Sequence, residues 1–327
     1  MESEIKYKSF CKKNISNIAF GCATLANIYN PISEIDSCDL VYHAFNRGIN
    51  YFDVAPFYGG GLAEKRLGIC IKNLNRNDIF LATKIGRYTS QNSNSGAGGY
   101  FDFTPSMIEK SIKQSMSNME TNYIDLIQCH DIENVKMIDI LNCLPLLEHF
   151  KSTQKIGGIG INSYPLQPLL NVLDNSKIKV DSIGTYAHHT LINDSILEII
   201  PEMKKKNVEI INSSPLGMGL LTEKGPPIWH PASILMCETV NNIKLYCKNN
   251  SENISNIAMR YSLSNNELLT NITGANSINE IEMNINSLNN NIPDTYLKDI
   301  SIIAYPIKNK LWGPEDGITP IYNWDYI

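Results

Sequence analysis

Eight short runs of β-branched and apolar residues recur along the chain, and longer stretches with the period of an amphipathic helix separate them. A run of this length and composition is typical of a buried strand. The runs are Ile18 to Ala23, Ile49 to Val54, Ile79 to Ile85, Tyr123 to Cys129, Ile156 to Ile161, Val180 to Tyr186, Val208 to Asn212 and Leu269 to Gly274. Eight strands, each followed by a helix, predict an α/β protein of the (β/α)8 TIM barrel type.

The stretches between the runs carry the start signals expected of helices. Ser33 precedes an acidic first turn, Thr104 is followed by proline, and Ser277 has Glu280 three residues later. Two of the helices predicted in this way are Ile35 to Asn46 and Thr104 to Met119. An α/β barrel of 327 residues folds as one unit, so we expect residues 1–327 to form a single domain.

A doubly wound sheet also alternates strands with helices and is the main alternative to the barrel. Its dinucleotide fingerprint needs three glycines in the pattern GxGxxG between a strand and a helix. The glycine clusters Gly157-Gly158-Ile159-Gly160 and Gly217-Met218-Gly219 both lack the third glycine at the required offset. The sequence therefore favours the barrel.

Composition narrows the class of protein further. The net charge is −5 and no basic patch is present, which argues against binding of nucleic acid. The N-terminal segment has no apolar core of the signal-peptide kind, and no apolar run reaches the length of a membrane span, so we expect a cytoplasmic protein that is not a membrane protein. The eight cysteines form no CxxC pair, and we expect them to be reduced core thiols. The adjacent His188 and His189 point apart on a strand, and we expect no metal site.

Four ionisable residues fall at the ends of three successive predicted strands. Asp53 and Tyr58 follow the second strand, Lys84 ends the third and His130 ends the fourth. The carboxyl ends of barrel strands meet at one rim, where catalytic groups gather. A tyrosine trades protons near neutral pH only if a nearby cation favours its phenolate, and a buried lysine needs a carboxylate to remain charged. We call these four residues the tetrad; each of them alone has a structural explanation, such as a helix cap or a packed core side chain.

Five segments in sequence order resemble the landmarks of the aldo-keto reductase superfamily. They are NYFDVAPFYGGG from Asn50, the TK of LATKIG, the HD of LIQCHD, GIGINSY around Gly160 and SSPLGMGLL from Ser213. The resemblance covers nearly the whole chain. Within the superfamily, the segment from Ser213 to Ser233 and the late PIKNKLW from Pro306 are most similar to members that oxidise L-galactose.

The resemblance implies a barrel oxidoreductase that moves hydride directly between a nicotinamide and a sugar or carbonyl carbon, without a metal. Tyr58 matches the general acid and base of the family, and Lys84 matches the cation that lowers its pKa. Asp53 matches the carboxylate that pairs with the lysine, and His130 the imidazole that orients the substrate oxygen. The chemistry agrees with this assignment, because a hydride leaves a C–OH carbon only if the hydroxyl proton is also removed.

The same resemblance implies a set of cofactor contacts. Asn162 is expected to bond the carboxamide, although the family has a Ser-Asn pair there and this chain has Asn162-Ser163. Ser213 stands where many members have an aromatic residue that stacks on the nicotinamide. The remaining expected contacts are Ser214, Leu216 and Gly217 for the pyrophosphate, and Ser277 and Asn284 for the adenosine end. The segment from Gly274 to Asn284 has no cation and carries Glu280, which predicts NAD rather than NADP.

The resemblance further implies a small-molecule substrate, namely a sugar oxidised at C1, with L-galactose as the leading candidate. Tyr186 and His188 at a strand end, and Trp229 in the loop PPIWHPAS, are the expected substrate contacts. The polar loop from Ser90 to Gly99 is expected to be flexible and to border the site. A general aldehyde or ketone reductase and a cofactor-binding regulatory subunit remain alternatives, and the sequence leaves the oligomeric state open.

Overall fold

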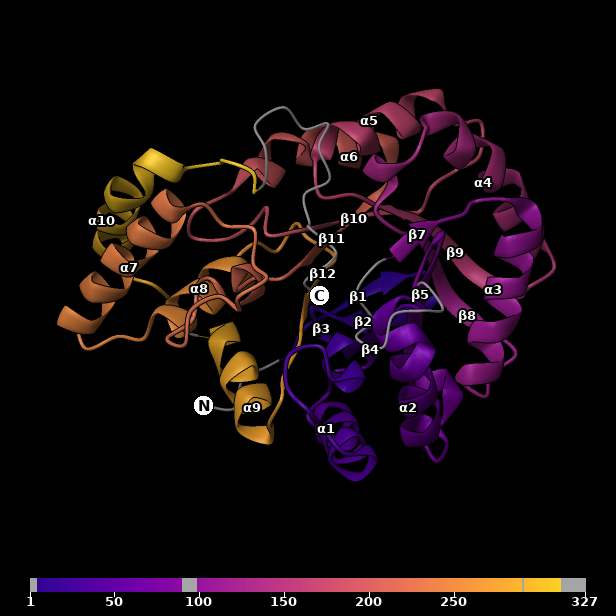
Figure 1. The fold of residues 1–327 in the computed structure, drawn as a ribbon, viewed down its shortest axis with the longest axis horizontal. Coiled ribbons are helices and arrows are strands. Elements are labelled where there is room, and N and C mark those ends of the chain that lie inside the picture. The colour runs from indigo at the N-terminus through magenta and orange to yellow at the C-terminus, as the bar shows by residue number, and fades with distance from the viewer. Residues whose placement is uncertain (1–4, 90–98, 290, 313–327) are drawn as a thin grey trace.

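A closed barrel of eight parallel strands forms the centre of the computed structural model, which describes residues 5–89, 99–289 and 291–312 (Figure 1). The strands are β3 (Ile18–Gly21), β4 (Tyr51–Asp53), β5 (Phe80–Ile85), β8 (Ile124–Cys129), β9 (Ile156–Asn162), β10 (Ser182–Tyr186), β11 (Glu209–Ser213) and β12 (Thr270–Thr273). Each pairs with the next, and β12 pairs with β3 to close the ring. The predicted fold class is confirmed, and every strand end lies within two residues of its expected position.

One helix follows each barrel strand and covers its outer face. These helices are α1 (Glu34–Asn46), α2 (Leu62–Ile71), α3 (Pro105–Asn118), α4 (Met137–Ser152), α5 (Leu166–Asn175), α6 (Ile200–Lys206), α8 (Ile254–Leu263) and α9 (Ile278–Asn286). Two further helices, α7 (Ile234–Asn249) and α10 (Asp294–Ala304), pack side by side at the edge of the molecule (Figure 1). The predicted start of α1 is confirmed, because the Ser33 hydroxyl accepts from the Asp36 backbone N–H at 3.1 Å.

Alternate residues of each strand point to different sides of the barrel wall. On β5, Leu81 and Ile85 pack in the layer between barrel and helices, whereas Phe80 and Ala82 fill the interior. The Phe80 ring lies 4.7 Å from that of Tyr51 across the interior. The barrel is therefore a packed core in its lower part.

An antiparallel hairpin closes the amino end of the barrel. Its strands are β1 (Tyr7–Phe10) and β2 (Lys13–Ser16), and each sends one large apolar side chain into the barrel interior. Phe10 lies 5.8 Å from Phe80, and Ile15 is fully buried. The sequence analysis missed this hairpin, because its strands are four residues long and most of their side chains are charged or polar.

A second hairpin lies above the carboxyl end of β5. It pairs β6 (Arg87–Thr89) with β7 (Gly99–Phe101), so Gly99 belongs to a strand and not to the loop predicted from Ser90 to Gly99. The rest of that predicted loop, residues 90–98, lies outside the described residues.

The expectation that all cysteines are reduced is wrong for Cys38 on α1 and Cys70 on α2. Their sulfurs form a disulfide, with the two Cα atoms 4.7 Å apart. The pair is 32 residues apart in sequence, and only the packing of α1 against α2 brings it together. The remaining six cysteines are free. None of the helices in the described ranges is long and apolar enough to span a membrane.

Candidate active site

The structure brings the four side chains of the tetrad together at the carboxyl end of the barrel. The Lys84 ammonium on β5 forms an ion pair with Asp53 at the end of β4 and donates to the Val54 carbonyl at 3.0 Å. The same nitrogen lies 5.1 Å from the ring centroid of Tyr58. The His130 ring, just beyond β8, stands edge-on to the Tyr58 ring with centroids 6.0 Å apart. A lysine, its carboxylate, a phenol and an imidazole therefore share one rim.

A glycine turn holds Tyr58 in this position. Gly59, Gly60 and Gly61 follow it directly, with φ angles of +61°, +61° and +89°, a region that residues with a side chain rarely adopt. At Gly59 a Cβ would also lie 2.9 Å from the Cβ of Ala26. The chain can therefore reverse right after Tyr58, pass η1 (Cys22–Ala26) and enter α2.

A second buried contact fixes the carboxylate of the tetrad. The Gln128 amide on β8 donates to the free oxygen of Asp53 at 3.0 Å, while Lys84 occupies the other oxygen. All three residues are 4% exposed or less. The sequence analysis missed Gln128, although its place two residues before His130 puts it on the same inward-facing side of β8.

Burial and charge act in opposite directions on Tyr58. Burial raises the pKa of the phenol, the nearby Lys84 lowers it, and Asp53 and Asp131 raise it again. The balance leaves the pKa of Tyr58 above its usual value, so the cation softens the effect of burial without overcoming it. For Lys84, burial alone would lower the pKa, but Asp53 and Tyr58 raise it above the usual value and keep the ammonium charged.

His130 is held as a neutral imidazole. Burial lowers its pKa to about 3, Lys84 and Arg87 act in the same direction, and Asp131 opposes them. Its Nδ1 atom is buried and has no hydrogen-bond partner among the described residues. At neutral pH this ring can donate one hydrogen bond and accept another, but it carries no charge.

A second buried ion pair lies beside His130. Arg87 of β6 pairs with Asp131, and the Asp131 Oδ2 atom lies 3.7 Å from His130 Nε2. The Arg87 guanidinium lies 3.7 Å from the ring centroid of Phe57. The sequence analysis did not single out Arg87 or Asp131, although each directly follows a tetrad landmark in GRY and CHD.

The carboxyl end of β9 carries Asn162, the residue expected to bond a carboxamide. Its Oδ1 atom is buried and lacks a hydrogen-bond partner within the described part of the chain. Gly184 on the neighbouring β10 leaves room for this amide, because a Cβ there would lie 2.8 Å from Asn162 Cγ. The site therefore holds an amide oxygen that a ligand N–H could satisfy.

The turn after β11 carries the residues expected at a pyrophosphate. Ser214 and Gly217 have φ angles of +55° and +56°, and Leu216 precedes the short helical turn η6 (Gly217–Gly219). The N–H groups of Ser214 and Gly217 donate to the Ile272 and Ser214 carbonyls, at 3.1 and 2.8 Å, so these two donors are engaged within the protein. Ser213 at the end of β11 pairs in register with Tyr186 at the end of β10.

The N-terminus of α9 has the expected Ser277 cap, and the Glu280 side chain reaches back to the residue before it. The Ser277 hydroxyl accepts from the Glu280 N–H at 3.2 Å, and the Glu280 carboxylate accepts from the Asn276 N–H at 2.8 Å. Asn284, one turn further along, is 7% exposed. Glu280 thus places a negative charge at the helix start, where no Lys or Arg is found from Gly274 to Asn284.

Two aromatic side chains from different loops lie over the rim. Trp229 in the loop after β11 is half-buried, and its ring lies 6.0 Å from Tyr29 in the loop after β3. Tyr29 as a whole is 39% exposed, but burial around its hydroxyl and, to a smaller extent, the proximity of Tyr58 raise its pKa to about 12. Tyr29 therefore lies close to the tetrad. Its position in the first loop of the carboxyl rim was the signal that the sequence analysis passed over.

Tyr186 belongs to a separate aromatic stack at the same rim. Its ring lies 4.7 Å from that of Tyr164, and Tyr164 in turn stacks on Trp312 at 5.2 Å. The Trp312 backbone N–H donates to the Tyr164 hydroxyl at 2.8 Å. Trp312 also meets His230 edge-on, with ring centroids 4.8 Å apart. The half-exposed Tyr186 ring is thus held in place by buried neighbours.

The expectation that His188 contacts the substrate is not supported by its position. The side chain is 1% exposed, Nε2 donates to the Tyr164 carbonyl at 2.5 Å, and Nδ1 lies 2.7 Å from Ser195 Oγ. Both ring nitrogens are therefore engaged inside the protein, because the chain turns after Tyr186 and carries His188 under the aromatic stack. We assign it a structural role.

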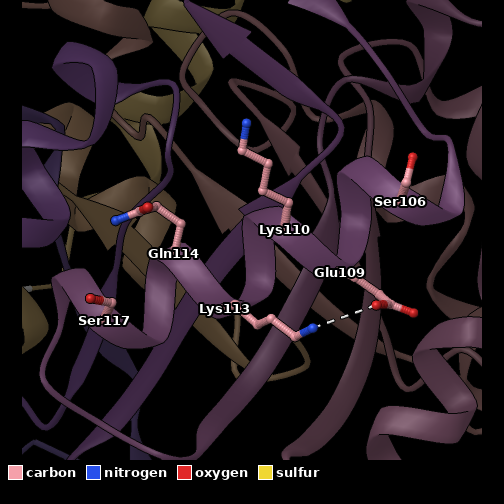
Figure 2. A pocket seen from close by; sticks show the side chains of 6 residues that line it. All are labelled: Ser106, Glu109, Lys110, Lys113, Gln114 and Ser117. Carbon is pink, nitrogen blue, oxygen red and sulfur yellow. Dashed lines mark ion pairs between the residues drawn. The ribbon is translucent and has the colours of Figure 1, made fainter.

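Shallow surface grooves on the outer helices lie apart from the tetrad. Figure 2 shows one of them, in which every lining side chain projects from α3 and Lys113 forms an ion pair with Glu109 at 3.6 Å. Its lining residues are Ser106, Glu109, Lys110, Lys113, Gln114 and Ser117. Among the residues that the structure describes, no three His, Cys, Asp or Glu side chains gather in a way that would hold a metal ion.

Comparison with known proteins shows the family to which the chain belongs. A sequence model described as the aldo/keto reductase family matches residues 17–304, and the chain belongs to that family. The protein is thus an oxidoreductase that uses a nicotinamide cofactor. It is 35% identical to L-galactose dehydrogenase of Arabidopsis thaliana over 306 residues, which cover 91% of this chain and 93% of the relative. It is 28% identical to D-arabinose 1-dehydrogenase of Saccharomyces cerevisiae over 272 residues, or 79% and 78% of the two chains.

The fold is also that of solved aldo-keto reductases. The structure of an aldo-keto reductase from Bacillus halodurans in its holo form superposes with a TM-score of 0.79 at 22% identity, covering 97% of this chain and 100% of the other. A glycerol dehydrogenase from Gluconobacter oxydans gives a TM-score of 0.73 at 17% identity, covering 95% and 98%. At these identities the likeness concerns the fold alone.

The burial of His188 predicts a loss of stability in acid. Burial lowers the pKa of His188 to about 4, against roughly 6.5 for a histidine in an unfolded chain. Between these values the unfolded chain holds more protons, so the free energy of unfolding falls as the pH falls from about 6.5 toward 4. His188→Gln should make this fall shallower by up to ~1.4 kcal/mol per pH unit. Urea denaturation at several pH values measures the slope, and an identical slope in the variant would contradict the assignment.

Proposed function

We propose that this protein oxidises an aldose at C1 with NAD, giving a lactone, and that L-galactose or a similar sugar is the substrate. The observation that carries the proposal is the Tyr58 phenol at the barrel rim, with the Lys84 ammonium on one side and the neutral His130 on the other. The 35% identity to L-galactose dehydrogenase supports the choice of substrate class.

The chemistry follows from what each side chain can do. Oxidation of a cyclic sugar breaks the C1–H bond with its electron pair and the O–H bond of the C1 hydroxyl. The bound NAD would accept the hydride. Tyr58 takes the hydroxyl proton as general base, and Lys84 stabilises the phenolate that this requires. Asp53 and Gln128 hold Lys84 in place, and His130 donates a hydrogen bond to the sugar oxygen. In the reverse direction Tyr58 returns the proton.

The residues around the rim fit a nicotinamide dinucleotide. The unpaired Asn162 Oδ1 suits the N–H group of a carboxamide. The turn of Ser214, Leu216 and Gly217 presents backbone that a pyrophosphate can approach closely. The start of α9, with Ser277 and the buried Asn284, suits the adenosine end. Together these groups follow the carboxyl ends of β9, β11 and β12.

Removal of the phenol hydroxyl tests the role of Tyr58. General acid and base groups contribute about 10² to 10⁴ in rate, so Tyr58→Phe should lower kcat by about 10² or more. Binding of NAD, measured by fluorescence quenching, should change little. Tyr305→Phe removes a hydroxyl from a side chain that is 82% exposed and serves as the matched control. Retention of most activity in Tyr58→Phe would show that another group moves the proton.

The charge of Glu280 predicts the choice between NAD and NADP. A carboxylate at the start of α9 would repel the 2′-phosphate of NADP, so NAD should be the better cofactor by kcat/KM. Glu280→Gln keeps a capping side chain but removes the charge, and Glu280→Arg adds a cation. The ratio of kcat/KM with NAD to kcat/KM with NADP should fall in that order, by about tenfold or more for Glu280→Arg. Equal or better kinetics with NADP in the unaltered protein would refute the assignment.

The aromatic pair of Tyr29 and Trp229 supports a sugar as the substrate. An aromatic face packs well on a pyranose ring, and polar side chains that bond hydroxyls reject analogues without them. The tyrosine hydroxyl near the tetrad adds such a polar group. Tyr186, at the carboxyl end of β10, offers a further phenol to the same rim.

A substrate screen with purified protein tests the whole proposal. L-galactose, L-fucose, D-arabinose and simple aliphatic aldehydes are assayed with both nicotinamides. We expect kcat/KM for L-galactose well above that for the aldehydes, and Trp229→Ala should weaken sugar use more than NAD binding. Ile228→Ala, at a fully exposed position in the same loop, is the control. A preference for small aldehydes that Trp229→Ala leaves unaltered would favour a general reductase. Tight NAD binding with no turnover would favour a regulatory subunit.

A further inference from the structure

Two buried ion pairs lie at the carboxyl rim, and the proposed mechanism uses only one of them. Lys84 and Asp53 flank Tyr58, whereas Arg87 and Asp131 flank His130. All four charged side chains are 9% exposed or less. A buried ion pair contributes little net stability, because the cost of removing both charges from water is similar to their attraction. Stability alone therefore does not explain the second pair.

The Arg87 side chain is fixed from several sides. Its guanidinium lies over the Phe57 ring at 3.7 Å and lies 5.9 Å from the Phe101 ring of β7. Phe57 directly precedes Tyr58, and its ring is edge-on to His130 with centroids 6.2 Å apart. The cation is thus held in the same aromatic packing that surrounds the imidazole.

Asp131 links this cation to His130 through one carboxylate oxygen. Oδ2 pairs with the Arg87 guanidinium and lies 3.7 Å from His130 Nε2. The residue has φ +51°, so the chain turns sharply right after His130 and brings the carboxylate back beside the ring. A carboxylate next to one ring nitrogen favours the tautomer with the proton on that nitrogen.

The charges around the imidazole act in opposite directions. Burial is the main cause of the lowered pKa of His130; among the charges, Asp131 raises this pKa, and Lys84 and Arg87 lower it. For Asp131, burial raises the pKa, whereas His130, Arg87 and Lys84 lower it. Burial and the charge of Asp131 raise the pKa of the neighbouring Glu133 to about 8. Without Arg87, the Asp131 carboxylate would face the ring uncompensated and favour the imidazolium.

We propose that Arg87 and Asp131 are positioning residues that hold His130 as a neutral imidazole with its proton on Nε2. Asp131 selects the nitrogen that carries the proton, and Arg87 balances the carboxylate so that the ring is not protonated. The second pair thus acts on His130 as the first pair acts on Tyr58. The donation from this N–H to the sugar oxygen rests on the proposed function. The protonation state and tautomer of the ring do not depend on it.

Nitrogen-15 NMR of the imidazoles tests this without turnover. The chain has six histidines, and a His130→Gln spectrum identifies the missing signal. In the unaltered protein His130 should remain neutral down to about pH 5 with the proton on Nε2. Arg87→Met should raise its titration midpoint by one pH unit or more, and Arg87→Lys should restore most of the original behaviour. Asp131→Asn should keep the ring neutral but leave a mixture of tautomers.

Arg87→Met leaves a buried carboxylate unpaired and can fail to fold. The double variant Arg87→Met with Asp131→Asn removes both charges and keeps the volume. Its His130 should be neutral with mixed tautomers; a pure Nε2 proton there would overturn the proposal. An unaltered His130 titration in folded Arg87→Met would also overturn the proposal.

Arg76→Met is the matched control. It removes the guanidinium that lies 2.7 Å from buried Asp125, at the opposite end of the barrel. It should lower stability and leave the His130 signal as it was.

Kinetics provide a second readout if the protein oxidises sugars. Asp131→Asn and the double variant should lower kcat/KM for the sugar by about tenfold, while the Kd for NAD stays within about twofold. Arg87→Met should lose activity at acidic pH, whereas Arg87→Lys should keep it. If the NMR changes occur as expected but the sugar kinetics are unchanged, the state of the His130 ring has no effect on catalysis. The absence of any sugar oxidation would count against the proposed function and not against the state of the ring.

Discussion

The contact between Lys84 and Asp53 is the interaction on which the rest of the rim depends. A lysine with almost no exposure keeps its charge only because a carboxylate touches it, and that carboxylate in turn needs Gln128 on its other oxygen. Three strands, β4, β5 and β8, supply one member each. The barrel must therefore close in the correct register before the cation exists, and only then does Tyr58 have a charged neighbour. The charge next to Tyr58 therefore depends on the correct pairing of the barrel strands.

The carboxyl rim is organised as two halves with similar construction. Each half has a reactive ring, a cation and a carboxylate: Tyr58 with its pair on one side, and His130 with its pair on the other. The two rings pack edge-on against each other, so the phenol and the imidazole belong to one small region of the rim. Burial keeps water from screening these charges, which makes small displacements of either pair matter more than they would on a surface.

Much of this arrangement could be read from the sequence, for a physical reason. The alternation of strands and helices fixes which residues end a strand, and in a barrel all strand ends meet, so the tetrad followed from the pattern. Arg87 was missed because it belongs to a short hairpin beyond the barrel strand, and Tyr29 because it lies in a loop without periodicity. The Cys38–Cys70 bridge depends on how two helices pack. The burial of His188 depends on a turn after Tyr186, which no spacing rule reveals.

The hairpin at the amino end gives the barrel a closed floor. Phe10 and Ile15 fill the space that would otherwise lead out of the interior at that end. Within the described part of the chain the amino end is thus filled, so a ligand approaches Lys84 from the carboxyl rim, where Tyr29 and Trp229 lie. Substrate and cofactor would therefore share one side of the barrel, and each has to leave room there for the other.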